Sequence, residues 1–550
     1  MSDPASITGG GLRLELGYPD ERQFAEAVGQ LLTDRVASRI TAQDPTLWGA
    51  DAEAEAAKRL SWVTLAETSR PLVAEIDALR AELAAEGVDQ VVLAGMGGSS
   101  LAPEVICATA GVPLVTLDTT DPGQVRAALA QDLERTVLAV SSKSGGTVET
   151  DSHRRAYEKA FTDAGIDPKR RIVVVTDPGS PLRQTAEDAG YRKVFLADPN
   201  VGGRYSALTA FGLVPSGLAG ADLTALLDAA AEASTVLSTD AETNPGLRLG
   251  ALLGLAHNST SNDGAGCDKV VFADFGSGIP GFGDWAEQLI AESTGKDGRG
   301  LLPVVVESPQ AAGFADAGPD AVLAQLGGYD ESYPPASGWG VAVSGPLGGQ
   351  LLLWEYATAI AGRLIGINPF DQPNVEEAKK QARALLDAPE ATAEDPQLTD
   401  GAVQVFGTGF ELSGAETLAD ALHAFFAAAP ERGYVSIQAY LDRHADAAAA
   451  NLRPAVASRT GLQTTFGWGP RFLHSTGQYH KGGHPNGVFL QITADSAEDL
   501  AVPDRPYSFA TLQRAQAAGD AAVLADKGRP VLHLHLTDRA AGIGQLMQAL

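Results

Sequence analysis

One short stretch of the chain concentrates groups that could bind a phosphate. Residues 141–147 (SSKSGGT) carry four hydroxyl side chains, a lysine and two glycines directly after an apolar run typical of a buried strand. Hydroxyls, free backbone N–H groups and an ammonium together favour a phosphate dianion. A solvated serine-rich loop would not explain the position at a strand end. We therefore predict a phosphate site made by Ser142, Lys143, Ser144 and Thr147.

A glycine-rich loop, residues 95–100 (GMGGSS), follows another apolar run and precedes a predicted helix. Glycines let a ligand approach the backbone, and a helix N-terminus favours anions. Asp118 lies 23 residues after Gly95, as a ribose-binding acid would in a dinucleotide fold, but Ser100 replaces the third glycine of that fingerprint. The loop could also be an ordinary tight strand-to-helix turn without a ligand. The phosphate loop at 141–147 argues against a dinucleotide ligand. In the glycine-rich loop, the candidate substrate-binding residues are Gly97, Gly98 and Ser99.

The elements that must position these loops are short apolar runs alternating with helical segments. This alternation is typical of an α/β fold with doubly wound parallel sheets. In such sheets, ligands lie at the carboxyl ends of the strands. The expected strands are residues 91–95, 113–118, 136–142, 171–177 and 193–198, then 269–274, 301–307 and 339–345.

Chain length and composition predict several domains. A length of 550 residues is too long for one ordinary core. Residues 387–402 are acidic and rich in Pro and Ala, which predicts a linker. We expect a helical N-terminal segment (1–85), a first sugar-phosphate-binding domain (86–215), a second domain of the same class (216–386) closed by a helical stretch at 346–386, and a C-terminal α/β region (403–550).

The charge balance excludes some classes of partner. With 40 Lys and Arg against 69 Asp and Glu, the net charge is -29, which argues against nucleic acid or an anionic membrane as the main partner. Two cysteines fit a reducing compartment. The N-terminus lacks the pattern of a signal peptide, and no apolar run approaches the roughly 18 residues that span a bilayer. We expect a soluble cytoplasmic protein.

Four motifs resemble the phosphoglucose isomerase family. SSKSGGTVET is similar to the sugar-phosphate loop of sugar isomerase (SIS) domains, and VGGRYSALTAFG (201–212) resembles the first family signature. GRLIGINPFDQPNVEEAK (362–379) resembles the second signature, with Asn374 where Gly or Ala is usual. EQLIAESTGK (287–296) resembles the catalytic-glutamate segment. The form of this isomerase found fused to transaldolase is the nearest likeness, although no transaldolase portion is evident.

The resemblance implies a fold of two SIS-like domains and a glucose-6-phosphate isomerase reaction. D-glucose 6-phosphate would become D-fructose 6-phosphate through a cis-enediol, in glycolysis and gluconeogenesis, with no metal or redox cofactor. Glu292 would move the proton and Arg204 would stabilise the enediol oxygens. Gln288 shares a helix face with Glu292, while Glu307 at a strand end is the rival base. Gln372 and Lys379 match the second signature, with Lys379 an active-site lysine.

The histidine departs from the family pattern. A family histidine that follows the glutamate helps to open the sugar ring, but residues 293–361 contain none. The segment 470–487 instead holds three candidates, and HSTGQ resembles the HSMGQ stretch of some bacterial members. We predict His474 as the ring-opening group, with His480 as the fallback. The segment could also be a lid without chemistry. A metal site with His484 is disfavoured because no carboxylate or cysteine partner is suitably spaced.

The expected partner is a hexose 6-phosphate, and the resemblance implies a homodimer with active sites at the subunit interface. Two other interpretations stay open: another SIS-type isomerase, including one that accepts mannose 6-phosphate, and a non-catalytic sugar-phosphate-binding regulator. The presence of both Glu292 and Arg204 argues against the regulator.

Overall fold

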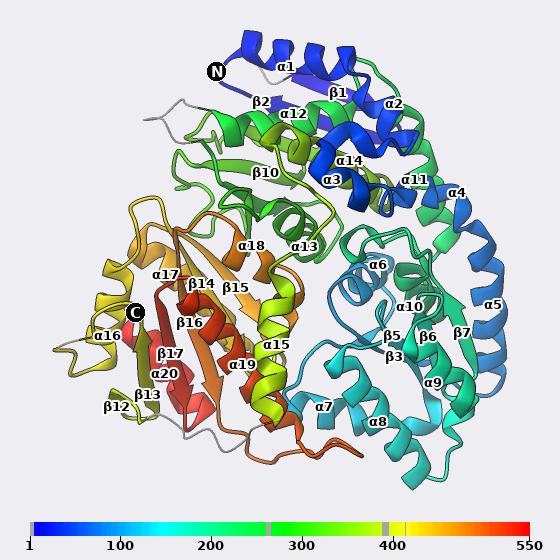
Figure 1. The fold of residues 1–550 in the computed structure, drawn as a ribbon, viewed down its shortest axis with the longest axis vertical. Helices are drawn as coiled ribbons and strands as arrows, with labels where there is room; N and C mark the ends of the chain where they lie inside the picture. The colour runs from blue at the N-terminus through cyan, green and yellow to red at the C-terminus, as the bar shows by residue number, and fades with distance from the viewer. Residues whose placement is uncertain (1–4, 260–265, 388–394, 413) are drawn as a thin grey trace.

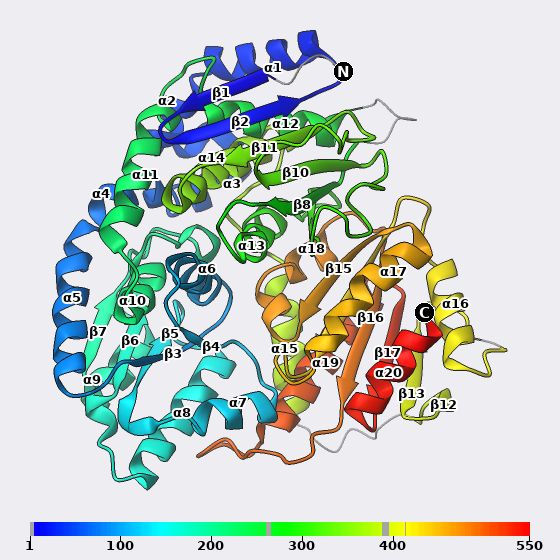
Figure 2. The same ribbon diagram turned by 180° about the vertical axis from the view of Figure 1, so that it is seen from behind.

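The protein is described by a computed structural model that covers residues 5–259, 266–387, 395–412 and 414–550, without the side chains of residues 5, 376, 378, 379 and 387. The described residues form three sheets, each in its own part of the molecule (Figures 1 and 2). We call these parts the first domain (86–219), the second domain (5–17 with 220–387) and the third domain (395–550). The predicted α/β class is confirmed.

The first domain holds a five-stranded parallel sheet in the order β4-β3-β5-β6-β7. Its strands match the predicted apolar runs, because residues buried on both faces of a parallel sheet are apolar throughout. They are β3 (Gln90–Gly95), β4 (Val115–Leu117), β5 (Thr136–Ser141), β6 (Ile172–Thr176) and β7 (Lys193–Leu196).

The second sheet has the order β1-β2-β11-β10-β8-β9. The strands of its parallel part are β8 (Lys269–Phe275), β9 (Leu302–Val305), β10 (Ala321–Gly327) and β11 (Gly340–Ser344). The prediction of an all-helical segment 1–85 is wrong at its start: β1 (Ala5–Gly9) and β2 (Leu12–Gly17) form a hairpin, and β2 pairs antiparallel with β11. The alternating burial of LRLELG, with Leu12, Leu14 and Leu16 inside, marks this half-buried strand.

The third sheet has the order β12-β13-β17-β16-β14-β15. Its strands are β12 (Leu398–Asp400), β13 (Val403–Thr408), β14 (Tyr434–Tyr440), β15 (Gln463–Trp468), β16 (Gly487–Ala494) and β17 (Val531–Leu536). The predicted linker 387–402 is corrected in part, because β12 lies within it and pairs with β13. Residues 388–394 of that linker lie outside the described residues.

The three sheets share one strand order. Numbered by their sequence within each domain, the parallel strands run second-first-third-fourth: β4-β3-β5-β6, β9-β8-β10-β11 and β15-β14-β16-β17. The chain direction across the sheet reverses between the first and third strands, where doubly wound sheets bind ligands. The C-terminal region is therefore a third doubly wound unit of the same strand order.

Helices cover the sheets and connect the domains. Those before and within the first domain are α1 (Glu21–Thr33), α2 (Val36–Thr41), α3 (Ala50–Ala56), α4 (Leu65–Thr68), α5 (Arg70–Ala85), α6 (Leu101–Ala110), α7 (Pro122–Leu129), α8 (Val148–Asp163), α9 (Pro181–Ala189) and α10 (Ala210–Ala219). The later ones are α11 (Leu223–Leu237), α12 (Pro245–Asn258), α13 (Phe282–Thr294), α14 (Leu347–Ile365), α15 (Val375–Asp387), α16 (Leu418–Ala427), α17 (Leu452–Thr460), α18 (Gly477–Gly482), α19 (Phe509–Asp526) and α20 (Arg539–Ala549).

The predicted helical stretch 346–386 is two helices. α14 ends at Gly366, whose φ of 81° suits a glycine cap, and Pro369 follows. α15 then runs between the first and third domains (Figure 1). Between the two helices, residues 367–374 form a loop that carries Phe370, Asp371 and Gln372 of the second signature motif.

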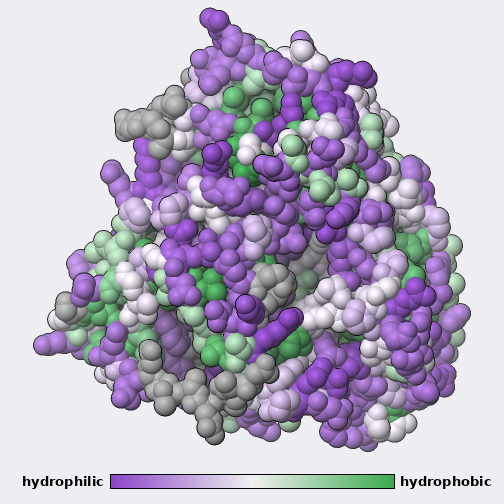
Figure 3. Space-filling view, viewed as in Figure 1, coloured by the Kyte–Doolittle hydropathy of each residue, from purple (hydrophilic) through white to green (hydrophobic). Residues whose placement is uncertain are grey.

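The surface and the helices can be compared with what the composition suggests. The face seen in Figure 3 is mainly hydrophilic, with apolar residues scattered in small areas. Among the described residues, no helix is both long and apolar enough to cross a bilayer.

Candidate active site

The predicted phosphate loop lies between β5 and α8, at the carboxyl edge of the first sheet. It curls on itself: the hydroxyls of Ser142 and Thr147 are 3.1 Å apart, and the Gly145 N–H donates to Ser142 Oγ at 3.2 Å. Thr147 is the N-cap residue of α8, but its hydroxyl makes no capping bond. The N–H groups of the first turn therefore remain available to an anion.

Lys143 takes a different position from the one expected. Its Nζ is 2.5 Å from Asp177 Oδ2, which lies after β6, and it is not among the residues that line the adjacent cavity. Burial lowers the pKa of Lys143 and raises that of Asp177. Lys143 thus holds the loop through Asp177, and neither it nor Ser142 lines the cavity, whereas Ser144, Gly146 and Thr147 do.

A cavity of about 270 Å³ opens in front of this loop. Its walls come from the phosphate loop, from α15, from the segment before α18, and from α19 of the third domain. The lining residues are Ser144, Gly146, Thr147, Val148, Glu149, Val375, Ala382, Arg383, Leu386, Leu473, His474, Lys481, Leu512 and Gln516. Lys379 lies within α15, but its side chain falls outside the described residues.

His474 reaches the phosphate-loop side of the cavity. Its Nε2 is 3.0 Å from Glu149 Oε1, and the Gln516 amide donates to the same oxygen at 2.6 Å. The side chains of His474 and Glu149 are 14% and 5% exposed. A carboxylate bonded to Nε2 orients the ring and leaves Nδ1 as the nitrogen that can exchange a proton. This is the arrangement that the ring-opening prediction needs.

Glu292 and Arg204 face each other at 4.0 Å, Nε to Oε2, with side chains 14% and 2% exposed. A hydrogen bond agrees with the predicted helix phase: the Gln288 amide donates to Glu292 Oε2 at 3.2 Å. The same amide donates to the backbone oxygen of His474 at 2.9 Å. Gln288 therefore connects the carboxylate to the histidine segment.

The second signature is tied to Arg204. The guanidinium donates to Gln372 Oε1 at 2.7 Å and to the carbonyls of Phe370 and Asp371 at 3.0 Å. Lys296 holds the same loop through the backbone and carboxylate of Asp371 at 2.6 and 2.7 Å. Burial, with Arg204 nearby, lowers the pKa of Lys296 to about 8.

The glycine-rich loop serves close packing. A Cβ at Gly98 would lie 2.0 Å from the Gly203 carbonyl, and one at Gly97 would lie 2.7 Å from the His474 carbonyl. Gly97 also has a φ of 55°. These glycines let the loop before α6, including the buried Ser99, touch both the Arg204 segment and the histidine segment.

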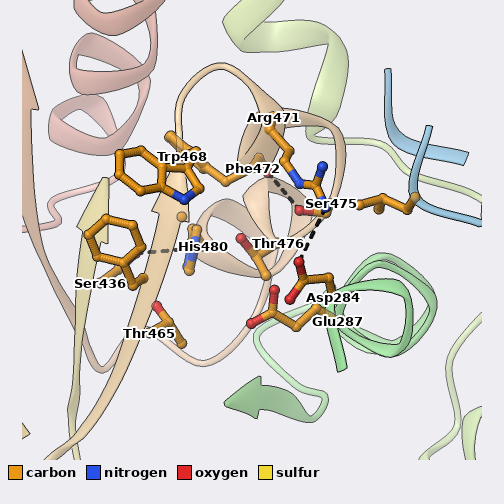
Figure 4. Close-up of a pocket in the computed structure, with 13 residues that line it drawn as sticks. Asp284, Glu287, Ser436, Thr465, Trp468, Arg471, Phe472, Ser475, Thr476 and His480 are labelled. Carbon is orange, nitrogen blue, oxygen red and sulfur yellow. Dashed lines mark hydrogen bonds and ion pairs between the residues drawn. The ribbon is translucent and has the colours of Figure 1, made fainter. Parts of the chain in front are cut away.

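Glu307, His480 and His484, the alternative candidates from the sequence, lie in other surroundings than Glu292 and His474. Glu307 forms a two-point ion pair with Arg453 of the third domain, at 2.6 and 2.5 Å. His480 is buried, with Nδ1 3.1 Å from the Tyr434 hydroxyl and Nε2 3.3 Å from Ser436 Oγ. It lines a separate cavity of about 50 Å³, which Glu287 and Thr465 also line (Figure 4). His484 Nε2 is 3.4 Å from His257 Nε2, and no group of side chains in the described ranges has the makeup of a metal site.

Asp118, the candidate ribose acid, has a structural role. Arg471 Nη1 lies 2.6 Å from Asp118 and 2.5 Å from Glu104, and Nη2 lies 3.2 Å from Asp284 (Figure 4 shows the last pair). One arginine of the third domain thus binds carboxylates of the first and second domains. The dinucleotide alternative loses its ribose ligand.

Comparison with known proteins agrees with this geometry. The phosphoglucose isomerase family profile matches residues 68–308. A probable glucose-6-phosphate isomerase of Natronomonas pharaonis is 30% identical, with 60% of this chain and 86% of the relative covered. The chain belongs to the phosphoglucose isomerase family. A second probable glucose-6-phosphate isomerase, from Haloarcula marismortui, is 30% identical over 54% of this chain and 78% of its own length.

Two solved structures are similar to this one. A hypothetical protein from Thermus thermophilus has a TM-score of 0.57 at 28% identity, covering 68% of this chain and 99% of that one. A glucose-6-phosphate isomerase from Chlamydia trachomatis has a TM-score of 0.54 at 19% identity, covering 71% of this chain and 91% of that one, which shows a shared fold. The segment that matches the family profile ends before the third domain begins.

Several site residues escaped sequence reasoning. Glu149 lies within SSKSGGTVET, two residues after Thr147, and Lys296 is the last residue of EQLIAESTGK. The only sign in the sequence was that each is a charged residue in a motif already assigned to the site. Lys481 and Gln516 lie in the third domain: Lys481 falls within the histidine segment 470–487, and no local pattern distinguishes Gln516 from an ordinary helix residue. Only the docking of that domain brings them to the site.

Proposed function

We propose that this chain is a glucose-6-phosphate isomerase that interconverts D-glucose 6-phosphate and D-fructose 6-phosphate. The observation that carries the proposal is the facing pair of Glu292 and Arg204, with Gln288 joining it to the His474 segment beside a loop suited to phosphate. An aldose–ketose isomerase needs a base and a cation at the enediol oxygens, with an anchor for the phosphate.

In the proposed mechanism, the phosphate binds at the loop before α8. Ser144 and Thr147 donate their hydroxyl protons, and the backbone N–H groups of the first turn add further bonds. Ser142 shapes the loop through Thr147, and Lys143 holds it through Asp177. An anion held here against the net charge of -29 relies on this local set of donors.

Ring opening is assigned to His474, oriented by Glu149, with Lys379 as the second candidate. His474 Nδ1 takes the proton of the anomeric hydroxyl and delivers it to the ring oxygen as the C1–O5 bond breaks, and the Glu149 carboxylate stabilises the imidazolium that forms between the two transfers. Gln372 positions Arg204 near the reacting carbons.

Isomerisation then moves one proton between adjacent carbons. Glu292 removes the proton from C2 of the open-chain aldose and returns it to C1, a hydroxyl proton passes from O2 to O1 in the enediol, and Arg204 stabilises the negative charge on these oxygens. No step requires a metal or a redox cofactor. The mannose 6-phosphate alternative shares the phosphate loop and differs in the residues around C2. The non-catalytic alternative leaves the pairing of Glu292 with Arg204 without a purpose.

The setting of the enzyme follows from the family and the composition. We propose a cytoplasmic enzyme of glycolysis and gluconeogenesis, supported by its two free, buried cysteines. The homodimer that the resemblance implies stays a prediction.

The test is a coupled assay of fructose 6-phosphate conversion without added metal. Glucose 6-phosphate should form with wild-type protein and not with Glu292→Gln. Mannose 6-phosphate is assayed in parallel. Absence of turnover on both sugars, together with tight sugar-phosphate binding, would favour the regulator.

A further inference from the structure

The third domain completes the cavity from outside the family-matching segment. Five of the residues that line the cavity belong to it: Leu473, His474, Lys481, Leu512 and Gln516. Lys481 is a buried cation of this wall, 2.5 Å from Asp520, with side chains 2% and 0% exposed.

The contact between the third domain and the remainder of the chain is extensive and buried. Arg471 and Arg453, whose side chains are 10% and 2% exposed, reach carboxylates of the first and second domains. Lys269 of β8 donates to the Arg432 carbonyl of the third domain at 2.9 Å. Apolar side chains of β8 and β9 pack in one cluster with Tyr434, Tyr479 and Phe489 of the third domain.

One contact involves the position where this sequence departs from its family signature. Asn374 donates its backbone N–H to Gln478 Oε1 at 2.9 Å and accepts from Gln478 Nε2 at 2.9 Å. The Gln478 amide also donates to the Gly295 carbonyl, three residues after Glu292. A glycine or alanine at position 374 could not accept the side-chain bond, so this residue fits a chain whose own third domain docks there.

We propose that each chain builds its complete active site from its own three domains, with the third domain supplying the histidine side of the site, so that no second copy contributes a residue. This inference rests on the proposed function. It differs from the shared sites that the family resemblance implies, and it holds whether or not two chains associate. The third domain supplies the wall of the cavity that carries His474.

The test uses two full-length inactive variants, Glu292→Gln in the second domain and His474→Ala in the third. They are co-expressed with different affinity tags, and assemblies that carry both tags are isolated in two steps. We expect no recovery of activity, because every chain lacks one group. With shared sites, a two-chain assembly would contain one intact site and regain about half of the wild-type activity, and that recovery would overturn the proposal.

A second co-expression serves as the control and should give the opposite result. Wild type is co-expressed with the double variant Glu292→Gln/His474→Ala. Sites built within one chain predict about half of the wild-type activity in a doubly tagged pair, whereas shared sites predict almost none. If no doubly tagged assembly forms while wild type is active, the proposal is supported directly. Wild-type turnover in both single variants would instead reject the residue assignments of the proposed function, which is a distinguishable failure.

Discussion

The first and third domains have the same strand order but different chemistry at the same place. In the first, the crevice between the ends of β3 and β5 holds glycines and hydroxyls, and the loop after β5 lines the cavity of about 270 Å³. In the third, the crevice between the ends of β14 and β16 holds Asp442, Asp446, Asp495 and Glu498. Strand order decides where a crevice forms, and the residues at the strand ends decide what occupies it.

In the third domain, a salt bridge network with the first domain occupies the crevice. Arg539, the first residue of α20, lies 2.9 Å from Asp446 and 2.7 Å from Asp121, the buried N-cap of α7. Carboxylates at this edge repel a phosphate but attract an arginine. The same topological position therefore holds the proposed phosphate site in one domain and a salt bridge between domains in the other.

The largest expected effect is on kcat, and it distinguishes the proposed base, Glu292, from a carboxylate of the third-domain crevice, Asp446. Glu292→Gln should lower kcat by roughly 10²–10⁴-fold, because it removes the general base. The matched change Asp446→Asn in the third-domain crevice should leave kcat within about twofold of wild type, since surface and docking groups do not enter the chemistry. Steady-state kinetics of both variants, with circular dichroism to verify folding, make the comparison. Similar losses in the two would end the distinction.

Removing Arg539 should test the docking side. Arg539→Met leaves the Asp121 carboxylate buried without its partner, so the free energy of unfolding should fall by about 3 kcal/mol. Urea unfolding measures this loss. Arg505→Met, which removes a 40% exposed partner of Asp151, is the control and should cost less than about 1 kcal/mol. If Arg539→Met is as stable as the control, the crevice is not a docking element.

The hydroxyls of the phosphate loop should affect binding. Ser144→Ala and Thr147→Ala each remove a bond to a charged acceptor, worth about 1.5–3 kcal/mol, and should raise KM for the sugar phosphate accordingly. Inorganic phosphate should compete with substrate in wild type. Ser496→Ala in the third-domain crevice is the matched control with unchanged KM. An unchanged KM in both loop variants, without phosphate inhibition, would refute the phosphate site.

The smallest effect concerns pH. The pKa of Lys296 is lowered from 10.5 to about 8 by burial, so above about pH 8 the ammonium that holds Asp371 loses its proton. We expect kcat/KM to decline on this alkaline side. Burial penalises the ammonium below about pH 8, and this cost to folding disappears as the pH rises from about 8 to 10.5. Lys296→Arg keeps the positive charge and should remove the alkaline decline in kcat/KM. If the variant has the same pH profile as the wild type, the decline belongs to another group.

Sequence patterns predicted the strands of the first domain and missed others for a physical reason. Continuous apolar runs mark β3 to β7 because both faces are buried. β14 and β15 are also buried, but Ser436, Gln438, Thr464 and Thr465 interrupt their apolar pattern. The hairpin β1–β2 escaped because helices follow it at once, and its partner β11 lies more than 300 residues later.

The sequence by itself determined the residue types of the phosphate loop and the shared helix face of Gln288 and Glu292, because both depend on local spacing. The roles expected for Glu292 and for Arg204, which follows two glycines, came from the resemblance of their motifs to the phosphoglucose isomerase family. Only the tertiary structure decided among the histidines and the carboxylates. His474 meets Glu149 across 325 residues, while Glu307 is paired with Arg453 across 146. Such pairings are set by how whole domains bury their apolar faces against each other, and no local pattern along the chain records that packing.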